Sequence, residues 1–200
     1  GYSLAINWIL YKILIAIEPP KEGVFPIDGR EFKHYTFRFW IAYFTIWMLR
    51  AMPLPWADMF AFRAFGAKIG KDTVLYDSWI DVEFVEVGDH VMLSLNTGIF
   101  SHCIYRDEFL VKKVVIKKNG IVGAEALVAP GTVIEEGGVV GAGSTTHIGQ
   151  HLGDYRIHVG TPCNKSFPVK IVEADENGNN NGVKPKENDN ENKLEKKNSS

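Results

Sequence analysis

The feature that most constrains the fold is a six-residue repeat in the middle of the chain. Read in sixes from Ile69, the units are IGKDTV, LYDSWI, DVEFVE, VGDHVM, LSLNTG and IFSHCI, and the frame resumes at Ile116 with IKKNGI, VGAEAL, VAPGTV, IEEGGV and VGAGST. The first position is aliphatic in ten of these eleven units, and Asp81 is the exception. A period sustained over so many units indicates a repeat architecture, in which each unit forms one small structural element.

A six-residue period has a direct geometric meaning. Three short strands make one triangular coil, so each unit supplies one flat face. The first residue of the unit points inward and stacks on its equivalent three units later, while the fourth residue points outward. Successive coils hydrogen-bond through parallel ladders and bury their apolar interior on one another. The sequence therefore predicts a mainly β fold, a single-stranded left-handed parallel β-helix from about Ile69 to Thr146.

Composition divides the chain into three zones. Residues 1–65 are apolar and aromatic, 66–172 carry the repeat and a closing turn, and 173–200 are almost entirely polar. In the first zone, two apolar runs, Leu4–Ile17 and Phe39–Leu49, end at prolines and predict a helical extension. The last zone cannot bury enough apolar surface to offset the entropy of ordering, so we predict a disordered tail.

The two apolar runs also bear on localisation. Each is shorter than the roughly 20 apolar residues that a transmembrane helix needs. Their tryptophans and tyrosines, with Arg38 and Arg50 flanking the second run, suit the membrane–water interface. We therefore expect membrane association on the cytoplasmic side. The alternative is a cytoplasmic protein whose helices cap the open end of the β-helix, and the two roles are compatible.

The repeat is interrupted once, and the interruption points to a site. The frame is lost across Tyr105–Val115, directly after His102, the fourth residue of its unit. An insertion at a corner of a rigid scaffold must protrude, and such loops commonly carry function. An imidazole can take the proton from a hydroxyl or amine, so His102 is the candidate general base. Whether Leu110–Val115 adds one more rung is left open by the sequence.

Residues 63–166 resemble the hexapeptide-repeat O-acetyltransferases of sugars and antibiotics. The segment RAFGAKIG followed by IDVEFVEVGDHV is also similar to the membrane-linked terminal β-helix domains of nonribosomal peptide synthetases. The resemblance implies an acyltransferase that moves an acyl group, in the simplest case acetyl, from a CoA thioester to a hydroxyl or amine acceptor. His102 would be its general base. Acetyl-CoA or another acyl-CoA would be a co-substrate with no permanently bound cofactor. The chain would form a homotrimer or, if the helical zone covers the face that packs in such trimers, stay monomeric.

The same resemblance implies a donor site. The stretch IVGAEALVAPGTVIEEGGVVGAGS is similar to the family's acyl-CoA-binding coils, and HVGTPCNK is similar to its closing turn. The candidate donor-binding residues are Gly123, Ala124, Gly141, Ala142, Gly160 and Thr161. The chain differs from the sugar acetyltransferases at Ile121, where they usually carry Trp, and at Lys117, where they carry Gly.

Two further residues are candidates for substrate binding. Asn96 is fourth in LSLNTG and points outward on the face before His102, toward donor or acceptor. If Leu110–Val115 is a full rung, Glu125 stacks on His102 and orients its imidazole, as the third member of a catalytic triad does. If the interruption is wholly loop, Glu125 lies on another face.

Other classes of function compete with acyl transfer. A fold alone never proves activity, so a non-catalytic scaffold or assembly domain of a larger membrane protein is the main alternative. A γ-class carbonic anhydrase would need three histidines converging on zinc. His90 and His102 are twelve residues apart and so fall on different faces, and no metal site is predicted. The net charge of −2 and the lack of a basic stripe argue against a nucleic-acid partner.

Overall fold

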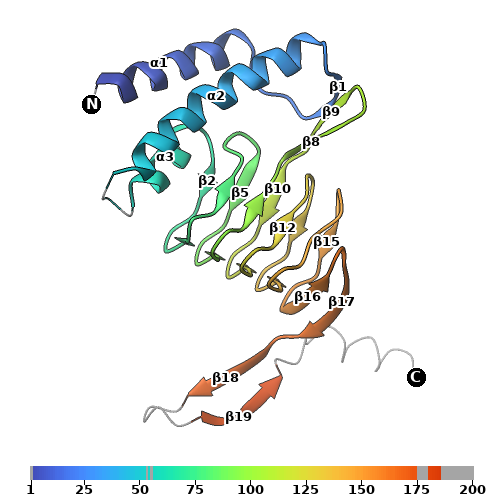
Figure 1. The fold of residues 1–200 in the computed structure, drawn as a ribbon. Coiled ribbons are helices and arrows are strands. Elements are labelled where there is room, and N and C mark those ends of the chain that lie inside the picture. Colours follow the sequence, from blue (N-terminus) through green and yellow to red (C-terminus); the bar gives the residue numbers. More distant parts are fainter. Residues whose placement is uncertain (1, 53, 55, 175–179, 186–200) are drawn as a thin grey trace, which may run out of the picture.

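The computed structural model describes residues 2–52, 54, 56–174 and 180–185. Its repeat region is a β-helix with three parallel faces, as predicted (Figure 1). Face 1 contains β2 (Lys68–Ile69), β5 (Val85–Val87), β10 (Val114–Ile116), β13 (Val133–Ile134) and β15 (His151–Leu152). Face 2 contains β3 (Val74–Leu75), β6 (Met92–Leu93), β11 (Ile121–Val122), β14 (Val139–Val140), β16 (Arg156–Gly160) and the antiparallel β17 (Cys163–Pro168). Face 3 is shorter, with β4 (Trp79–Ile80), β7 (Gly98–Ile99) and β12 (Leu127–Val128).

Inward-facing aliphatic residues stack from coil to coil and form the core. On face 1 the strand register aligns Ile69, Val87, Ile116, Ile134 and Leu152. This column and its counterparts on faces 2 and 3 account for most of the fully buried side chains of the repeat. Their burial is the main stabilising term for the fold, because a single coil has no interior of its own.

The first coil departs from the predicted frame at its third unit. The register pairs Ile80 with Ile99, so Ile80 and not Asp81 is the inward residue of face 3. The second unit thus has five residues, 75–79, and the third has seven, 80–86. Asp81 is nevertheless buried, with 1% of its surface exposed. The mismatch in the sequence pattern marks a buried carboxylate directly after a core position.

The interruption is a β-hairpin and contains no additional rung. Val87 pairs with Ile116, 29 residues later, which is eleven more than the eighteen of an uninterrupted coil. The extra residues form β8 (His102–Tyr105) and β9 (Glu108–Val111), which pair with each other and with β1 (Gly23–Pro26) in an antiparallel sheet. The possibility that Leu110–Val115 is a full rung is therefore wrong: its first two residues belong to β9, and its last two already belong to β10 on face 1.

Corners between faces have left-handed backbone at a constant place in the repeat. Fourth residues of the units with positive φ are Asp72, His90, Asn96, Asn119, Glu125, Gly131, Gly137, Gly143, Gly149 and Tyr155. Asn, Asp and Gly tolerate this conformation best, which explains their recurrence there. His102 occupies the same place in its unit but continues into β8 instead of turning. The hairpin thus begins where a corner turn would otherwise close the coil.

The N-terminal zone is helical, as predicted, and packs on the first coil. Its helices are α1 (Tyr2–Ile17), α2 (Arg30–Arg50) and α3 (Ala57–Ala64). They lie across the end of the β-helix (Figure 1). Tyr11, Ile46 and Phe62 belong to the same buried cluster as Ile80 and the rest of the coil interior. The helices therefore close the end of the coil stack, which is one of the two roles expected for them.

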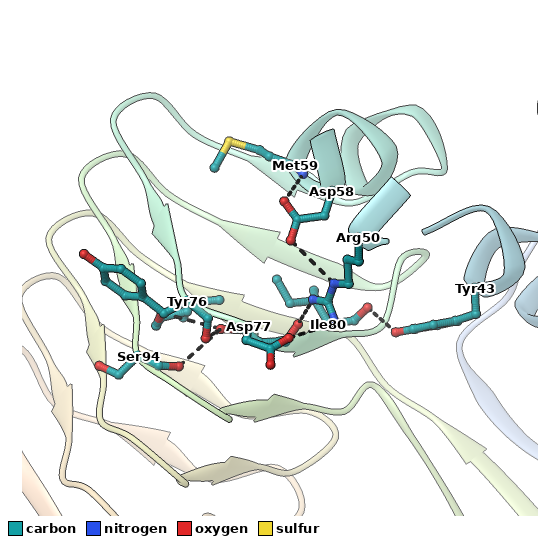
Figure 2. A network of polar contacts seen from close by, with 10 residues as sticks. Tyr43, Arg50, Asp58, Met59, Tyr76, Asp77, Ile80 and Ser94 are labelled. Carbon is teal, nitrogen blue, oxygen red and sulfur yellow. Dashed lines mark hydrogen bonds and ion pairs between the residues drawn. The ribbon is translucent and has the colours of Figure 1, made fainter. Parts of the chain in front are cut away.

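Arg50 at the end of α2 links the helices to the first coil (Figure 2). Its guanidinium donates to the Ser78 carbonyl at 2.5 Å and lies 3.5 Å from carboxylate oxygens of both Asp58 and Asp77. Tyr43, two turns earlier in α2, donates its hydroxyl proton to the Ile80 carbonyl. These contacts fix α2 over face 3 of the first coil.

A second, more deeply buried link lies near the middle of α2. Arg38 forms a bidentate pair with Glu83, with Nε–Oε1 and Nη2–Oε2 distances of 2.6 and 3.1 Å. Both side chains are almost fully buried, and the Tyr11 hydroxyl donates to the same carboxylate. Burial raises the pKa of the Tyr11 hydroxyl, and the Glu83 charge raises it further, so this tyrosine stays protonated.

At the opposite end, β16 and β17 form an antiparallel hairpin that closes the last coil. Beyond it, β18 (Lys170–Ala174) pairs with β19 (Asn180–Pro185). The sequence predicts a disordered tail over 173–200. The rest of that tail, residues 175–179 and 186–200, lies outside the described residues. Among the helices that the structure describes, none is long and apolar enough to cross a bilayer.

The buried Arg38–Glu83 pair provides a stability test. Replacing Arg38→Ala leaves the Glu83 carboxylate uncompensated in the interior and should lower the free energy of unfolding by roughly 3–5 kcal/mol. The matched control is Lys68→Ala, which removes an exposed pair with Glu86 and should cost less than about 1 kcal/mol. Urea denaturation of the two variants measures both values. Equal losses would show that the buried pair does not anchor the helices.

Candidate functional site

The site forms where the second coil opens into the hairpin. Asp81 follows the core residue Ile80, and Ser101 and His102 follow its register partner Ile99. Asp81 Oδ2 accepts hydrogen bonds from the Ser101 backbone N–H at 2.7 Å and from the Ser101 hydroxyl at 3.0 Å. The same oxygen lies 2.6 Å from His102 Nδ1. The stacking of two coils thus places a buried carboxylate against the candidate base.

The hydrogen bonds determine which imidazole nitrogen is free. The Ser101 N–H and hydroxyl both donate to Asp81 Oδ2, so this oxygen acts as a hydrogen-bond acceptor. His102 Nδ1 must then carry the proton and donate it to Oδ2. In a neutral ring, Nε2 keeps its lone pair, and no hydrogen bond to it is found among the described residues. The geometry is that of a base held by an orienting carboxylate.

Tyr35 completes the contacts of the imidazole. Its hydroxyl oxygen lies 2.8 Å from His102 Nδ1, so the N–H is shared between Tyr35 and Asp81. Burial, reinforced by the charges of Asp81 and Glu83, raises the pKa of Tyr35 well above its usual value. Burial also raises the pKa of the neighbouring Cys103 thiol. Both groups stay protonated near neutral pH, which leaves His102 as the proton acceptor of the site.

A pocket of about 160 Å³ lies beside the ring. We call it the acceptor pocket; it is lined by His102, Phe32, Tyr35, Thr36, Phe39, Trp40, Ile104 and Phe109. The rings of Tyr35, Phe39 and Phe109 have their centroids within 5.1–6.0 Å of the imidazole centroid. Residues of α2 form one wall and the hairpin forms the other. The hairpin and the helical extension, far apart in sequence, therefore enclose one face of His102.

A second, wider groove of about 390 Å³ crosses the outside of face 3. The face 3 groove is lined by Arg50, Asp77, Trp79, Asn96, Thr97, Gly98, Phe100 and Leu127. Asn96, exposed at the corner between faces 2 and 3, stands on one edge. Phe100, two residues before His102, stands toward the other. The groove thus runs from the Asn96 corner to the side of face 3 where His102 begins the hairpin.

The six candidate donor residues lie on turns at one corner. Gly123 and Ala124 follow β11, Gly141 and Ala142 follow β14, and Thr161 follows Gly160 at the end of β16. All three strands belong to face 2; the turns after β11 and β14 lead toward face 3, whereas the turn after β16 leads back into β17 on face 2. The predicted donor residues therefore stack along the corner that borders the face 3 groove.

Glu125 does not occupy the place required to orient His102. Because the interruption is a hairpin, Ile99 pairs with Val128 and not with Val122, so the unit of Glu125 belongs to face 2. Glu125 is exposed at the corner between faces 2 and 3, in the same column as Asn96. The hypothesis that it orients the imidazole is wrong, and Asp81 holds Nδ1 instead.

The histidines are dispersed in the structure. His90 lies at a corner between faces 1 and 2, His151 pairs with Glu135, and His158 lies nearly buried on β16. Within the described part of the chain, no three His, Cys, Asp or Glu side chains cluster as a metal site would require.

Sequence reasoning missed Asp81, Ser101 and the aromatic wall. Asp81 could have been noticed, because it is the one non-aliphatic residue at the first position of a unit. Tyr35 had none, since it is 67 residues from His102 and meets it only through the packing of α2.

Comparison with solved structures supports the fold. The chain superposes on a maltose O-acetyltransferase from Clostridium difficile 630 with a TM-score of 0.61 and 16% identity, covering 79% of this chain and 95% of that one. A hexapeptide-repeat acetyltransferase from Vibrio cholerae, solved in complex with acetyl-CoA, gives a TM-score of 0.51 and 14% identity over 70% and 90% of the two chains. At identities this low, the superpositions establish a common hexapeptide-repeat fold and nothing more.

In sequence, no protein-family model matches the chain. The Bacillus subtilis protein YvoF, whose name proposes an acetyltransferase activity, is 28% identical over 110 residues. The match covers 52% of this chain and 64% of YvoF, so it spans slightly less than two thirds of that relative.

Close packing between the corner turns predicts which glycines can be replaced by alanine without loss of stability. A Cβ on Gly123 would lie 2.5 Å from the Ala142 backbone nitrogen, whereas one on Gly153 would meet only the Arg156 side chain at 3.7 Å. Gly123→Ala should therefore destabilise the protein by roughly 1–3 kcal/mol, because backbone atoms must shift. Gly153→Ala is the control and should be close to neutral. Thermal unfolding compares the two, and equal melting temperatures would contradict the tight stacking of this corner.

Proposed function

We propose that the protein transfers an acyl group, in the simplest case acetyl, from a CoA thioester to a hydroxyl or amine, with His102 as the general base. The observation that carries the proposal is the contact between His102 Nδ1 and the buried Asp81 carboxylate. It fixes the ring and leaves Nε2 to accept a proton. The similarity to acetyltransferase structures, one of them holding acetyl-CoA, supports the identity of the donor.

The chemistry follows from the free nitrogen. Nε2 removes the proton of the acceptor hydroxyl or amine as its oxygen or nitrogen attacks the thioester carbonyl. The tetrahedral intermediate then collapses, the carbon–sulfur bond breaks, and the imidazolium returns the proton to the departing CoA sulfur. Asp81 stabilises the imidazolium formed between these steps, as a buried carboxylate does in other acid–base dyads. The acylated acceptor and free CoA are the products.

The donor belongs on the outside of face 3 in this proposal. The face 3 groove is open and borders the corner that carries Gly123, Ala124, Gly141 and Ala142. Gly160 and Thr161 continue this corner to the end of the helix, where the nucleotide part of CoA would lie. Asn96, on the groove edge, would contact the donor, and Glu125, below it on the same corner, is the second substrate-binding candidate.

A homotrimer is part of the proposal. Trp79 and Leu127 project exposed apolar surface from face 3. A second copy packed against this face would bury that surface and convert the open groove into an enclosed site. Closed cyclic assembly suits flat faces of this kind.

We also propose association with the cytoplasmic side of a membrane, in line with the finer resemblance to the membrane-linked peptide-synthetase terminal domains. The support is the large amount of apolar surface on the helices. Among the exposed residues are Ile6, Ile9, Leu10 and Ile13 of α1 and Phe37, Trp40, Phe44 and Trp47 of α2. Contiguous apolar patches of this kind mark membrane or protein interaction sites.

Replacing the proposed base distinguishes an acyltransferase from a non-catalytic scaffold. His102→Ala should lower kcat for acetyl transfer by roughly 10²–10⁴-fold, since Nε2 no longer removes the acceptor proton. Added imidazole should restore part of the rate. His90→Ala, which removes an exposed corner histidine, is the control and should keep full activity. Unchanged transfer in His102→Ala would overturn the base assignment, and wild type that neither binds CoA nor transfers acyl groups would favour the scaffold.

Asp81 is assigned as a positioning residue, and its test must exclude simple misfolding. Asp81→Asn removes the charge and offers an amide N–H to Nδ1, which favours the wrong tautomer. We expect kcat to fall by at least about 10²-fold while the KM for acetyl-CoA changes less than about twofold. Ser101→Ala keeps the carboxylate and two of its three hydrogen-bond donors, and should fall much less. A folded Asp81→Asn variant with wild-type kcat would contradict the role.

A further inference from the structure

The acceptor pocket is unusual for a site that would hold a sugar. Of its eight lining residues, six are aromatic or aliphatic, and His102 is the one that can carry a charge. The two hydroxyl groups of the lining are engaged: the Thr36 hydroxyl donates to the Phe32 carbonyl at 2.8 Å, and the Tyr35 hydroxyl contacts His102. A polyhydroxylated body placed there would lose its hydrogen bonds to water without replacement, at a cost for each group.

An aromatic wall joins this pocket to the face 3 groove. Trp79, which lines the groove, stacks on Tyr43 with centroids 4.3 Å apart and planes at 13°. Tyr43 packs on Phe39 at 4.4 Å, and Phe39 stacks on Tyr35 at 6.1 Å, both of which line the acceptor pocket. The proposed donor groove and the acceptor pocket therefore share one continuous apolar wall beside His102.

The same pocket reaches the exposed apolar surface of α2. Trp40 lines the pocket and is 66% exposed. Phe44 and Trp47 follow it on the exposed side of the helix, one and two turns further on. On the hairpin side, Ile104 lines the pocket and is also exposed, next to the exposed Tyr105. Exposed apolar side chains of α2 and of the hairpin thus extend from outside the protein to the pocket beside the candidate base.

We infer that the acceptor is an amphiphile, a hydroxyl or amine carried on an aromatic or aliphatic body. Its reactive group meets His102 Nε2, and its body lies against Phe32, Phe39 and Phe109 in the acceptor pocket. The assignment rests on the proposed acyl transfer and adds the substrate class to it. Such a molecule can come from a bilayer, which the exposed helices would contact, or from solution.

The acceptor class is tested with two primary amines, compared at equal concentrations of their unprotonated forms because their basicities differ. Phenethylamine and glucosamine both offer a primary amine to the same acetyl-CoA, but on an apolar and on a polyhydroxylated body. We expect kcat/KM to be at least about tenfold higher for phenethylamine, the discrimination that a hydrophobic pocket can supply. Equal or better turnover of glucosamine would overturn the inference while leaving the proposed function intact.

Variants of α2 test whether the preference for phenethylamine arises in the acceptor pocket. Phe39→Ala should lower kcat/KM for phenethylamine about tenfold, and should lower kcat/KM for glucosamine much less, because the loss is one of apolar contact. Phe39→Leu, which keeps an apolar side chain, serves if the alanine variant does not fold and should show a smaller loss in the same direction. Phe37→Ala, on the exposed side of α2 and outside the pocket, is the control. Loss of phenethylamine turnover in the control alone would contradict the assignment.

Vesicles distinguish the source of the acceptor. Hexadecylamine in phosphatidylcholine vesicles should be acetylated if the helices sit on a bilayer, and Trp47→Ala should slow that reaction without affecting phenethylamine. Turnover of phenethylamine alone would support the acceptor class and overturn the membrane placement. If calorimetry detects acetyl-CoA binding but no amphiphile reacts, the acceptor class is wrong. If neither binding nor transfer occurs, the proposed function itself fails.

Discussion

The contact between the buried Asp81 carboxylate and His102 is the interaction on which the site depends. Burying a carboxylate is costly unless hydrogen bonds compensate it, and all the donors to Asp81, which is 1% exposed, come from Ser101 and His102 and meet at Oδ2. These groups meet because Ile80 and Ile99 stand in register one coil apart. A shift of one residue would bring Asp81 into the coil interior and away from the imidazole. The irregular unit in the first coil is therefore part of the site and not a defect in the repeat.

The helical extension has two structural roles that reinforce each other. It closes the open end of the coil stack through Tyr11, Ile46 and Phe62. It also brings Tyr35 against His102 and supplies most of the acceptor pocket. The Arg38–Glu83 pair and the Arg50 network (Figure 2) hold α2 in the position that both roles require. Conformational freedom in α2 would thus alter the stability of the fold and the shape of the pocket together.

The sequence predicts local features well and long-range contacts poorly. The repeat, the helical extension and the interruption after His102 follow from short-range periodicity, because each coil repeats the same local geometry. The failure at Glu125 has a simple cause: the register across a hairpin depends on how many residues it extrudes, and no local pattern encodes that number. Asp81 was visible as a mismatch but became interpretable only with Ser101 beside it. Tyr35 required the docking of a helix that periodicity does not describe.

The most direct test of the account is the tautomer of His102 in the folded protein. In ¹⁵N-labelled protein, at a pH where the ring is neutral, two-bond ¹⁵N–¹H correlation spectra distinguish a protonated from an unprotonated ring nitrogen. His102→Ala assigns the resonances by their loss. The account predicts a protonated Nδ1, directed at Asp81, and an unprotonated Nε2 available to the acceptor. A ring with its proton on Nε2 would have no free lone pair there to take the acceptor's proton and would contradict the central claim.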